Sequence, residues 1–295
     1  MSLKIVCFGE ILWDEFPDKK IIGGAPLNVA LRLSSLGNQV RMISKIGNDP
    51  DGEALLAYLK ENNLNTEGIQ TDHQLPTGNV KVHLDENNTA TYTISEPVAW
   101  DQIMPNEIDI LKASEADAFV YGSLASRNQQ TKNTLSALLH QANFKIFDAN
   151  LRPPFYKMSF VIDLLMTADL IKLNDEELEE IAAQLNLDNS SIEQQIRSLA
   201  KITSTKHICI TLGSKGALLF SDEKIYFNKG YKVTVKDTVG AGDSFLASLI
   251  HQILNKKEAQ ESLDRSCGMG ALVASKNGAN AEVSQDEIDH LLGKF

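Results

Sequence analysis

The sequence predicts an α/β fold, a three-layer α/β/α sandwich in which helices cover both faces of a mainly parallel central sheet. Short, almost continuous apolar runs alternate with stretches of helical periodicity, and strands buried on both faces are typical of parallel sheets. We expect strands at 4–9, 40–47, 118–123, 144–150, 170–174 and 207–213. We expect helices at 26–36, 51–63, 129–141, 175–185 and 192–202.

The organisation of the chain indicates one main domain, residues 1–295. A length of 295 residues allows one large α/β domain or two ordinary ones. A hydrophobic content of 43% excludes a mainly disordered protein. The alternation of strands and helices continues without a linker, an internal repeat or a low-complexity tract, so we expect no domain boundary.

Two segments interrupt this alternation. Residues 79–95 alternate apolar and polar side chains around a polar turn at 85–88, which predicts a half-buried antiparallel hairpin. Residues 11–22 form a second extended segment. A small antiparallel sheet of this kind could cover an edge of the core, make a dimer or close over a site, and the pattern alone leaves these uses open.

Charge and cysteine content restrict the partners and the compartment. The chain has 28 Lys and Arg against 39 Asp and Glu, a net charge of −11, which argues against nucleic-acid or anionic-membrane partners but allows a local basic pocket. No apolar run approaches the length of a membrane span, and no signal peptide is evident. Cys7, Cys209 and Cys267 are far apart in apolar contexts, which predicts buried thiols in a reducing cytoplasm.

The strongest local signal is the segment 237–245, which reads DTVGAGDSF between a β-like run at 231–235 and an apolar helical pattern. Gly240 and Gly242 allow the backbone to approach a ligand closely. The unpaired N–H groups at a helix start suit a phosphate or a developing anion. The segment is neither a P-loop nor a dinucleotide fingerprint. A purely structural alternative makes Asp243 an ordinary helix N-cap.

A second glycine segment, GGAPLNVA at 23–30, precedes a predicted helix. Pro26 suits the first turn of that helix, and Gly37 suits its C-terminal end. The double glycine could bring backbone N–H groups and Asn28 to a polyhydroxyl ligand, or it could be a plain turn with Asn28 on the surface. Asp14 could likewise hold two sugar hydroxyls or be a solvated charge.

Three polar groups follow predicted strands, where ligands bind in open parallel sheets. They are DANLR at 148–152, NDEE at 174–177 and TLGSKG at 211–216. Each has a structural alternative, because Asn174 could cap the next helix and 213–216 could be a hairpin turn. The coincidence of so many ligand-capable segments at strand ends and helix starts indicates an enzyme.

Together these motifs resemble the ribokinase-like sugar kinase family, the phosphofructokinase-B type, and most closely its bacterial fructokinases. The segments 23–30 and 237–245 are similar to the N- and C-terminal signatures of the family, and the intervening motifs occur in the family's order. The resemblance implies a ribokinase-like sandwich with a β lid formed by about 11–22 and 76–99. It also implies transfer of the γ-phosphoryl group of ATP to a primary hydroxyl of a free sugar, converting D-fructose to fructose 6-phosphate.

The resemblance also implies a role for each site residue. Asp243 would be the general base, and the N–H groups of Gly240, Ala241 and Gly242 would form an anion hole. The residues implied to bind the sugar are Asp14, Gly23, Gly24, Asn28 and Arg152. Those implied to bind the nucleotide are Asn174, Thr211, Gly213, Gly216, Asn277 and Asn280. Glu177 would organise Mg²⁺ through water and Asp237 would bind K⁺, so ATP, Mg²⁺ and K⁺ are the implied cofactors. The only partners implied are sugar, ATP and a second copy that forms a homodimer through the lid.

The identity of the substrate is open, because relatives often have a longer loop where Arg152 here runs into Pro153 and Pro154. Ribose, a nucleoside, 2-keto-3-deoxygluconate and a sugar phosphate are alternatives. A sugar phosphate would require extra cations at the sugar end, for which Lys81 and Arg127 are the candidates. A non-catalytic sensing module predicts a broken base or anion hole, and both are intact. A nicotinamide dehydrogenase is disfavoured, because residues 9–12 after the first strand lack the dinucleotide glycines.

Overall fold

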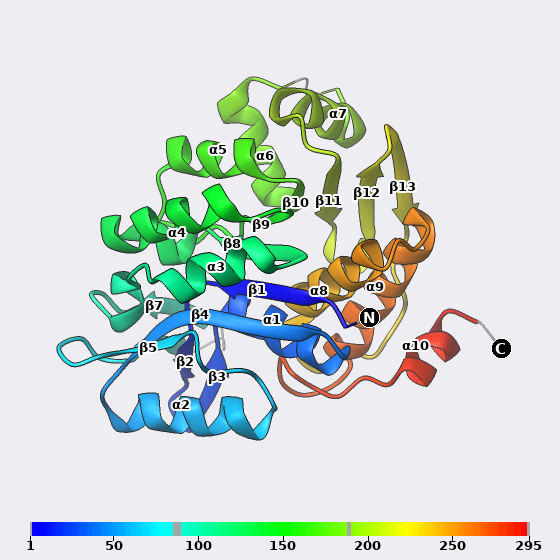
Figure 1. Ribbon diagram of the computed structural model, residues 1–295. Helices are drawn as coiled ribbons and strands as arrows, with labels where there is room; N and C mark the ends of the chain where they lie inside the picture. The colour runs from blue at the N-terminus through cyan, green and yellow to red at the C-terminus, as the bar shows by residue number, and fades with distance from the viewer. Residues whose placement is uncertain (1, 85–89, 188–189, 294–295) are drawn as a thin grey trace.

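A large, mainly parallel sheet forms the centre of the computed structural model, which describes residues 2–84, 90–187 and 190–293. Its order among these residues is β13-β12-β11-β10-β9-β8-β1-β4-β5 (Figure 1). The strands are β1 (Lys4–Phe8), β4 (Gln39–Gly47), β5 (Ile69–Asp72), β8 (Ala118–Gly122), β9 (Lys145–Asp148), β10 (Leu170–Asn174), β11 (His207–Thr211), β12 (Ala217–Ser221) and β13 (Lys224–Asn228). Among the described strands, β12 runs antiparallel to both of its neighbours, β11 and β13, and all other pairs are parallel, so the predicted mainly parallel sheet is confirmed.

Helices cover both faces of this sheet (Figure 1). One face carries α3 (Glu107–Glu115), α4 (Gln129–Gln141), α5 (Met158–Thr167), α6 (Asp175–Leu185) and α7 (Ile192–Thr203). The other carries α1 (Ala25–Ser35), α2 (Pro50–Glu61), α8 (Ala241–Leu254) and α9 (Ala259–Ala274), and α10 (Gln285–Leu291) packs against α9. Short 3₁₀ turns lie at Ala99–Gln102, Leu124–Arg127 and Gly213–Lys215. The predicted three-layer sandwich is therefore confirmed.

Strand β1 shows why the apolar runs are almost continuous. Val6 and Phe8 pack into the core under α3 to α7, whereas Ile5 and Cys7 pack into the core under α1 and α8. Because successive side chains of a strand point to opposite faces, a strand covered on both sides has to be apolar throughout.

A smaller sheet, with the order β3-β2-β6-β7, adjoins the carboxyl end of β1. Its strands are β2 (Leu12–Glu15), β3 (Lys20–Gly23), β6 (Gly78–Leu84) and β7 (Ala90–Ile94). The predicted hairpin is confirmed by the antiparallel pairing of β6 with β7, whereas its turn at 85–88 lies outside the described residues. Strands β2 and β3 also pair antiparallel, but β2 joins β6 in parallel, which the sequence did not predict. A pairing between segments that are far apart in the chain has no local sequence pattern that could predict it.

Several sequence expectations need correction. The β-like run at 231–235 has no regular secondary structure and forms an irregular connection toward α8. The predicted strands at 144–150 and 207–213 end earlier, at Asp148 and Thr211, so their polar ends lie in loops. The three cysteines are free and buried, as predicted. Within the ranges the structure describes, no helix is both long and apolar enough to cross a membrane.

Candidate functional site

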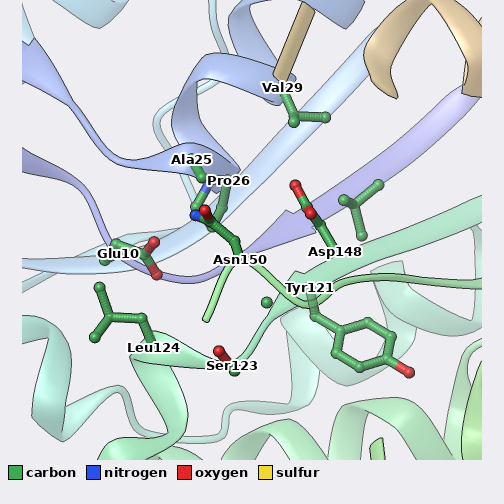
Figure 2. Close-up of a pocket in the computed structure, with 11 residues that line it drawn as sticks. Glu10, Ala25, Pro26, Val29, Tyr121, Ser123, Leu124, Asp148 and Asn150 are labelled. Atoms are coloured by element: carbon green, nitrogen blue, oxygen red, sulfur yellow. The ribbon is translucent and has the colours of Figure 1, made fainter. Parts of the chain in front are cut away.

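The strand order reverses beside β1, and polar groups meet at that point. The chain passes from β1 to β4 and β5 on one side, then fills the other side with β8 to β11. Glu10 follows β1, Ser123 follows β8 and Asp148 ends β9, and all three line a small pocket of about 10 Å³ (Figure 2). Open α/β sheets bind ligands at such a reversal. The pocket has room for about one water molecule, so a larger ligand would lie above it.

A hydrogen-bonded chain joins the two glycine segments. Nδ2 of Asn28 donates to Oδ2 of Asp243 at 2.8 Å, and Nδ2 of Asn280 donates to Oδ1 of Asn28 at 3.3 Å. Asn28 is only 4% exposed, so the alternative that places it on the surface is wrong. Nearby, Nε of the buried Arg32 donates to Oγ of Ser244 at 3.1 Å, which also fixes α1 against α8. The N- and C-terminal signature segments therefore form one site.

Asp243 lies in the first turn of α8 without capping it. The N-cap is Gly240, whose φ of 74° is left-handed, and no side chain caps the helix, so the N-cap alternative is wrong. The pKa of Asp243 is raised to about 6, mainly by burial and also by the charge of Asp148, although the bond from Asn28 and the charges of Lys172 and Arg152 oppose the shift. The dipole of α8 favours the charged form of Asp243, but burial outweighs it. A carboxylate with this pKa is ionised at neutral pH and basic enough to accept a proton.

A buried ion pair that sequence reasoning missed lies beneath the start of α8. Nζ of Lys172 contacts Oδ1 of Asp148 at 2.9 Å, and both residues are buried. Burial lowers the pKa of Lys172, but Asp148 and Glu177 raise it above its usual value, so the lysine is charged. Nζ lies 3.8 Å from the position that a Cβ on Gly242 would take. The sequence does carry a signal for this pair, because Lys172 is a lysine within the apolar run at 170–174.

The start of α8 offers backbone N–H groups beside this lysine. The N–H of Ala241 donates to the carbonyl of Thr238 at 3.2 Å. Within the described ranges, no backbone bond outside the helix engages the N–H groups of Gly240 and Gly242, and Gly242 is exposed. Free amides, a helix N-terminus and a cation together suit a negatively charged group.

Two of the residues predicted for the sugar, Asp14 and Gly23, lie against each other. A Cβ on Gly23 would collide with the carboxylate of Asp14, so this glycine allows Asp14 to lie close to the backbone. The pKa of Asp14 is raised to about 6 by burial, which outweighs the lowering effect of the charge of Arg152. Arg152 also lowers the pKa values of Glu10 and Asp243, so this exposed guanidinium lies near the whole acidic group.

Glu10 is a second residue that sequence reasoning missed. It is 3% exposed, its Oε2 has no partner in the described chain, and burial raises its pKa to about 7. Figure 2 shows its carboxylate beside Asn150 in the small pocket. Groups with perturbed pKa values concentrate at functional sites, and Glu10, Asp14 and Asp243 form such a group here.

Most of the residues predicted for the nucleotide also have a structural role in the fold. Asn174 caps α6, and Glu177 completes the capping box through Oε2, while its Oε1 accepts the N–H of Leu151 at 2.9 Å. Thr211 lies beside Asn174 in the sheet register. Gly213 and Gly216 form the turn between β11 and β12, so the hairpin alternative is confirmed for them.

Asp237 joins two loops at the far end of the site. Its Oδ1 accepts the N–H of Val239 at 3.0 Å, and its Oδ2 accepts the N–H of Gly278 at 3.2 Å. Asn277, beside this contact, is exposed. Asn280 instead contacts Asn28 at the centre of the site.

The arrangement fits a magnesium ion carried by phosphates better than a protein-bound one. No group of three or more His, Cys, Asp or Glu side chains in the described parts of the chain could hold a metal. Mg²⁺ commonly keeps its waters and binds through one or two carboxylates and substrate phosphates. Two carboxylates would hold the waters of a magnesium ion here, those of Asp148 and Glu177. Oδ2 of Asp148 is buried and has no hydrogen-bond partner among the described residues.

Comparison with known proteins identifies the class. Residues 4–286 match the pfkB family of carbohydrate kinases, so this chain belongs to that family and is a phosphotransferase acting on a sugar hydroxyl. A putative sugar kinase of Pyrococcus horikoshii is 30% identical over 90% of this chain and 84% of its own. Fructokinase-2 of Zea mays is 28% identical over 93% of this chain and 89% of its own. The structure of an ATP-bound fructokinase from Xylella fastidiosa has a TM-score of 0.85 at 22% identity, covering 100% and 99% of the two chains, and shows the shared fold.

Proposed function

We propose that this chain is an ATP-dependent fructokinase, which transfers the γ-phosphoryl group to the primary hydroxyl of D-fructose and forms fructose 6-phosphate. The observation that carries the proposal is the bond between Asn28 and Asp243. This bond joins the helix that follows Gly23 and Gly24 to the carboxylate in the first turn of α8. Fructokinase-2 of Zea mays, as a relative, supports fructose as the acceptor.

In this proposal the residues divide into binding and reacting groups. Asp14, Gly23, Gly24, Asn28 and Arg152 hold the sugar with one hydroxyl near Asp243. Asp243 accepts the proton of that hydroxyl as the oxygen attacks the γ-phosphorus, the bond from the γ-phosphorus to the bridging oxygen breaks, and ADP leaves. The N–H groups of Gly240 and Gly242, together with Nζ of Lys172, stabilise the charge on the transferred group.

The donor side follows from the same geometry. The nucleotide would lie along Asn174, Thr211, Gly213, Gly216 and Asn277, with the carboxylates of Glu177 and Asp148 facing the waters of Mg²⁺. When bound, Mg²⁺ neutralises phosphate charge. We also propose that K⁺ binds near Asp237, where it would sit beside the loop that carries Gly240.

The small sheet is proposed to act as a lid that excludes water during transfer. Its edge strands, β3 and β7, could pair with a second copy, which supports the predicted homodimer. A single domain over 1–295 and a cytoplasmic location remain predictions. Chromatography coupled to light scattering would test the dimer.

A substrate panel tests the proposed function. ATP consumption would be measured with fructose, ribose, adenosine, 2-keto-3-deoxygluconate and fructose phosphates, with kcat/KM for each. We expect fructose to have the highest kcat/KM. A higher value for another acceptor would replace fructose within the same class, and no turnover with any of them would overturn the proposal.

A further inference from the structure

Glu10 has a buried carboxylate oxygen that the rest of the described chain leaves unpaired. The residue is 3% exposed, and its Oε2 has no hydrogen-bond partner within the described ranges. Its backbone carbonyl borders the start of α1, because a Cβ on Gly24 would lie 2.5 Å from the carbonyl oxygen. A buried carboxylate oxygen without a donor is unfavourable, so Glu10 requires a donor that this arrangement does not supply.

Most donors around Glu10 are already engaged. In the small pocket that Glu10 lines, Oγ of Ser123 donates to the carbonyl of Ala149 at 2.7 Å. Nζ of Lys172 bonds to Asp148, which lines the same pocket, at 2.9 Å. The donor that completes Glu10 therefore has to come from a side chain that is still available.

Arg152 is the cation that can supply this donor. Its exposed guanidinium donates to the carbonyl of Leu151 at 3.2 Å and forms no ion pair with a carboxylate in the described parts of the chain. The pKa of Glu10 is raised to about 7, mainly by burial, and the charge of Arg152 opposes this shift. The charges of Asp243 and Asp148 add to it. Arg152 is therefore close enough to act on Glu10 but is not paired with it.

The loop that carries Arg152 is fixed next to Glu10. The N–H of Leu151 donates to Oε1 of Glu177 at 2.9 Å. The preceding residue, Asn150, has a left-handed φ of 38°, and its side chain lines the small pocket beside the carboxylate of Glu10 (Figure 2). A loop that is bonded at its base leaves the long, flexible side chain of Arg152 as the part that can turn.

We propose that Glu10 is a positioning residue, which pairs with Arg152 when the acceptor substrate binds. The guanidinium turns from solvent toward Oε2 of Glu10 and presents its remaining N–H groups to the acceptor. Arginine suits this role because its planar guanidinium has N–H donors on more than one edge. The proposal rests on the proposed function and deepens it, since it assigns to the same site a residue that acts through Arg152.

A double-mutant cycle on the intact enzyme tests the pairing. Glu10→Gln keeps the size of the side chain and removes its charge, Arg152→Ala removes the guanidinium, and a third variant combines both changes. KM and kcat are measured with the acceptor that has the highest kcat/KM in the substrate panel. Glu61→Gln is the matched control, because Glu61 is an exposed carboxylate in the last turn of α2.

We expect Glu10→Gln to raise KM for the acceptor roughly tenfold and to leave KM for ATP nearly unchanged, since a misplaced binding group weakens binding of one substrate only. The double variant should be no worse than Arg152→Ala alone, because Glu10 has no further effect once its partner is gone. Glu61→Gln should behave like the wild type. Additive effects, or no effect of Glu10→Gln, would overturn the proposal.

Stability separates this role from a structural one. The raised pKa of Glu10 means that its ionisation is unfavourable in the folded free protein. Glu10→Gln should therefore be at least as stable as the wild type at pH 8 in denaturant unfolding. A loss of stability together with equal changes in both KM values would show that Glu10 only supports the fold, which would overturn the proposal.

Calorimetry without ATP gives a readout that does not depend on turnover. Pairing with Arg152 holds Glu10 ionised, so acceptor binding at pH 7 should release roughly half a proton from a group with a pKa of about 7. Titrations in two buffers of different ionisation enthalpy measure this release, and both Glu10→Gln and Arg152→Ala should remove it.

The two proposals fail in different ways. If another acceptor binds with this proton release while fructose is not phosphorylated, fructose is the wrong substrate and the role of Glu10 stands. If fructose is phosphorylated but its binding releases no proton that depends on Glu10, the proposed function stands and the pairing is overturned. The absence of such a release with every acceptor of the panel also overturns the pairing.

Discussion

Helices α1 and α8 begin alike but present different groups to the site. Each starts at a glycine with a positive φ, 111° at Gly24 and 74° at Gly240, and neither has a side-chain cap. At α1, Pro26 lacks an N–H and packs against Gly9, so that end is closed. At α8, Gly242 is exposed and Asp243 lies in the first turn. In the proposed function, the start of α1 would position the sugar, and the start of α8 would supply the groups for the reaction.

The largest expected effect is that of Asp243→Asn. The variant keeps an acceptor for Asn28 but loses the base, so we expect kcat to fall by on the order of 10²–10⁴. The folded-state pKa of Asp243 is raised to about 6, above its ordinary value. Its ionisation therefore destabilises the fold increasingly as pH rises from about 4 to 6, and the penalty persists above that. The free energy of unfolding of the Asn variant at pH 8 should accordingly be equal or higher.

Steady-state kinetics and denaturant unfolding on the same samples check both parts. A folded variant that retained more than about a third of wild-type kcat would contradict the base assignment. A marked loss of stability would instead show that Asp243 has mainly a structural role.

On the α1 side, Asp14→Ala should affect sugar binding only. Charged hydrogen bonds are worth about 1.5–3 kcal/mol, so we expect KM for the sugar to rise roughly 10- to 100-fold while KM for ATP stays nearly constant. Glu15→Ala on the same strand is the control, because it removes a neighbouring carboxylate. Equal changes in both KM values would show that Asp14 supports the structure of the site.

The sequence predicted the layers, the parallel sheet and the glycine segments, because each depends on local periodicity or composition. It did not predict Lys172 and Asp148 as a pair, since their contact joins neighbouring strands that are 24 residues apart in the chain. The raised pKa of Asp243 could not be predicted from the sequence either, because burial is a property of packing. The start of a helix favours the charged carboxylate, but burial in the tertiary environment outweighs this effect.

The pH dependence of activity measures that tertiary environment. With the pKa of Asp243 at about 6, kcat/KM should rise with pH and level off above it, with a roughly tenfold deficit at pH 5. Arg152 lowers this pKa, so Arg152→Ala should move the midpoint upward. A wild-type midpoint near 4 would mean that the carboxylate is as solvated as an ordinary aspartate.

The smallest expected effect is that of Gly242→Ala, because Gly242 differs from the other glycines of the site. Gly240 has a positive φ and contacts Ala279, and Gly24 lies against the backbone of Glu10, so both are required by the fold. Gly242 has a helical conformation, and the nearest atom to an added Cβ is Nζ of Lys172 at 3.8 Å. Gly242→Ala should therefore increase the free energy of unfolding by about 0.5–1 kcal/mol, because alanine favours helix.

If the phosphoryl group lies against this turn, the added methyl should lower kcat by roughly three- to tenfold, since small misplacements of reacting groups are costly. A variant that is more stable and fully active would place the transferred group elsewhere. The thermal melt and the kcat of one preparation decide between the two.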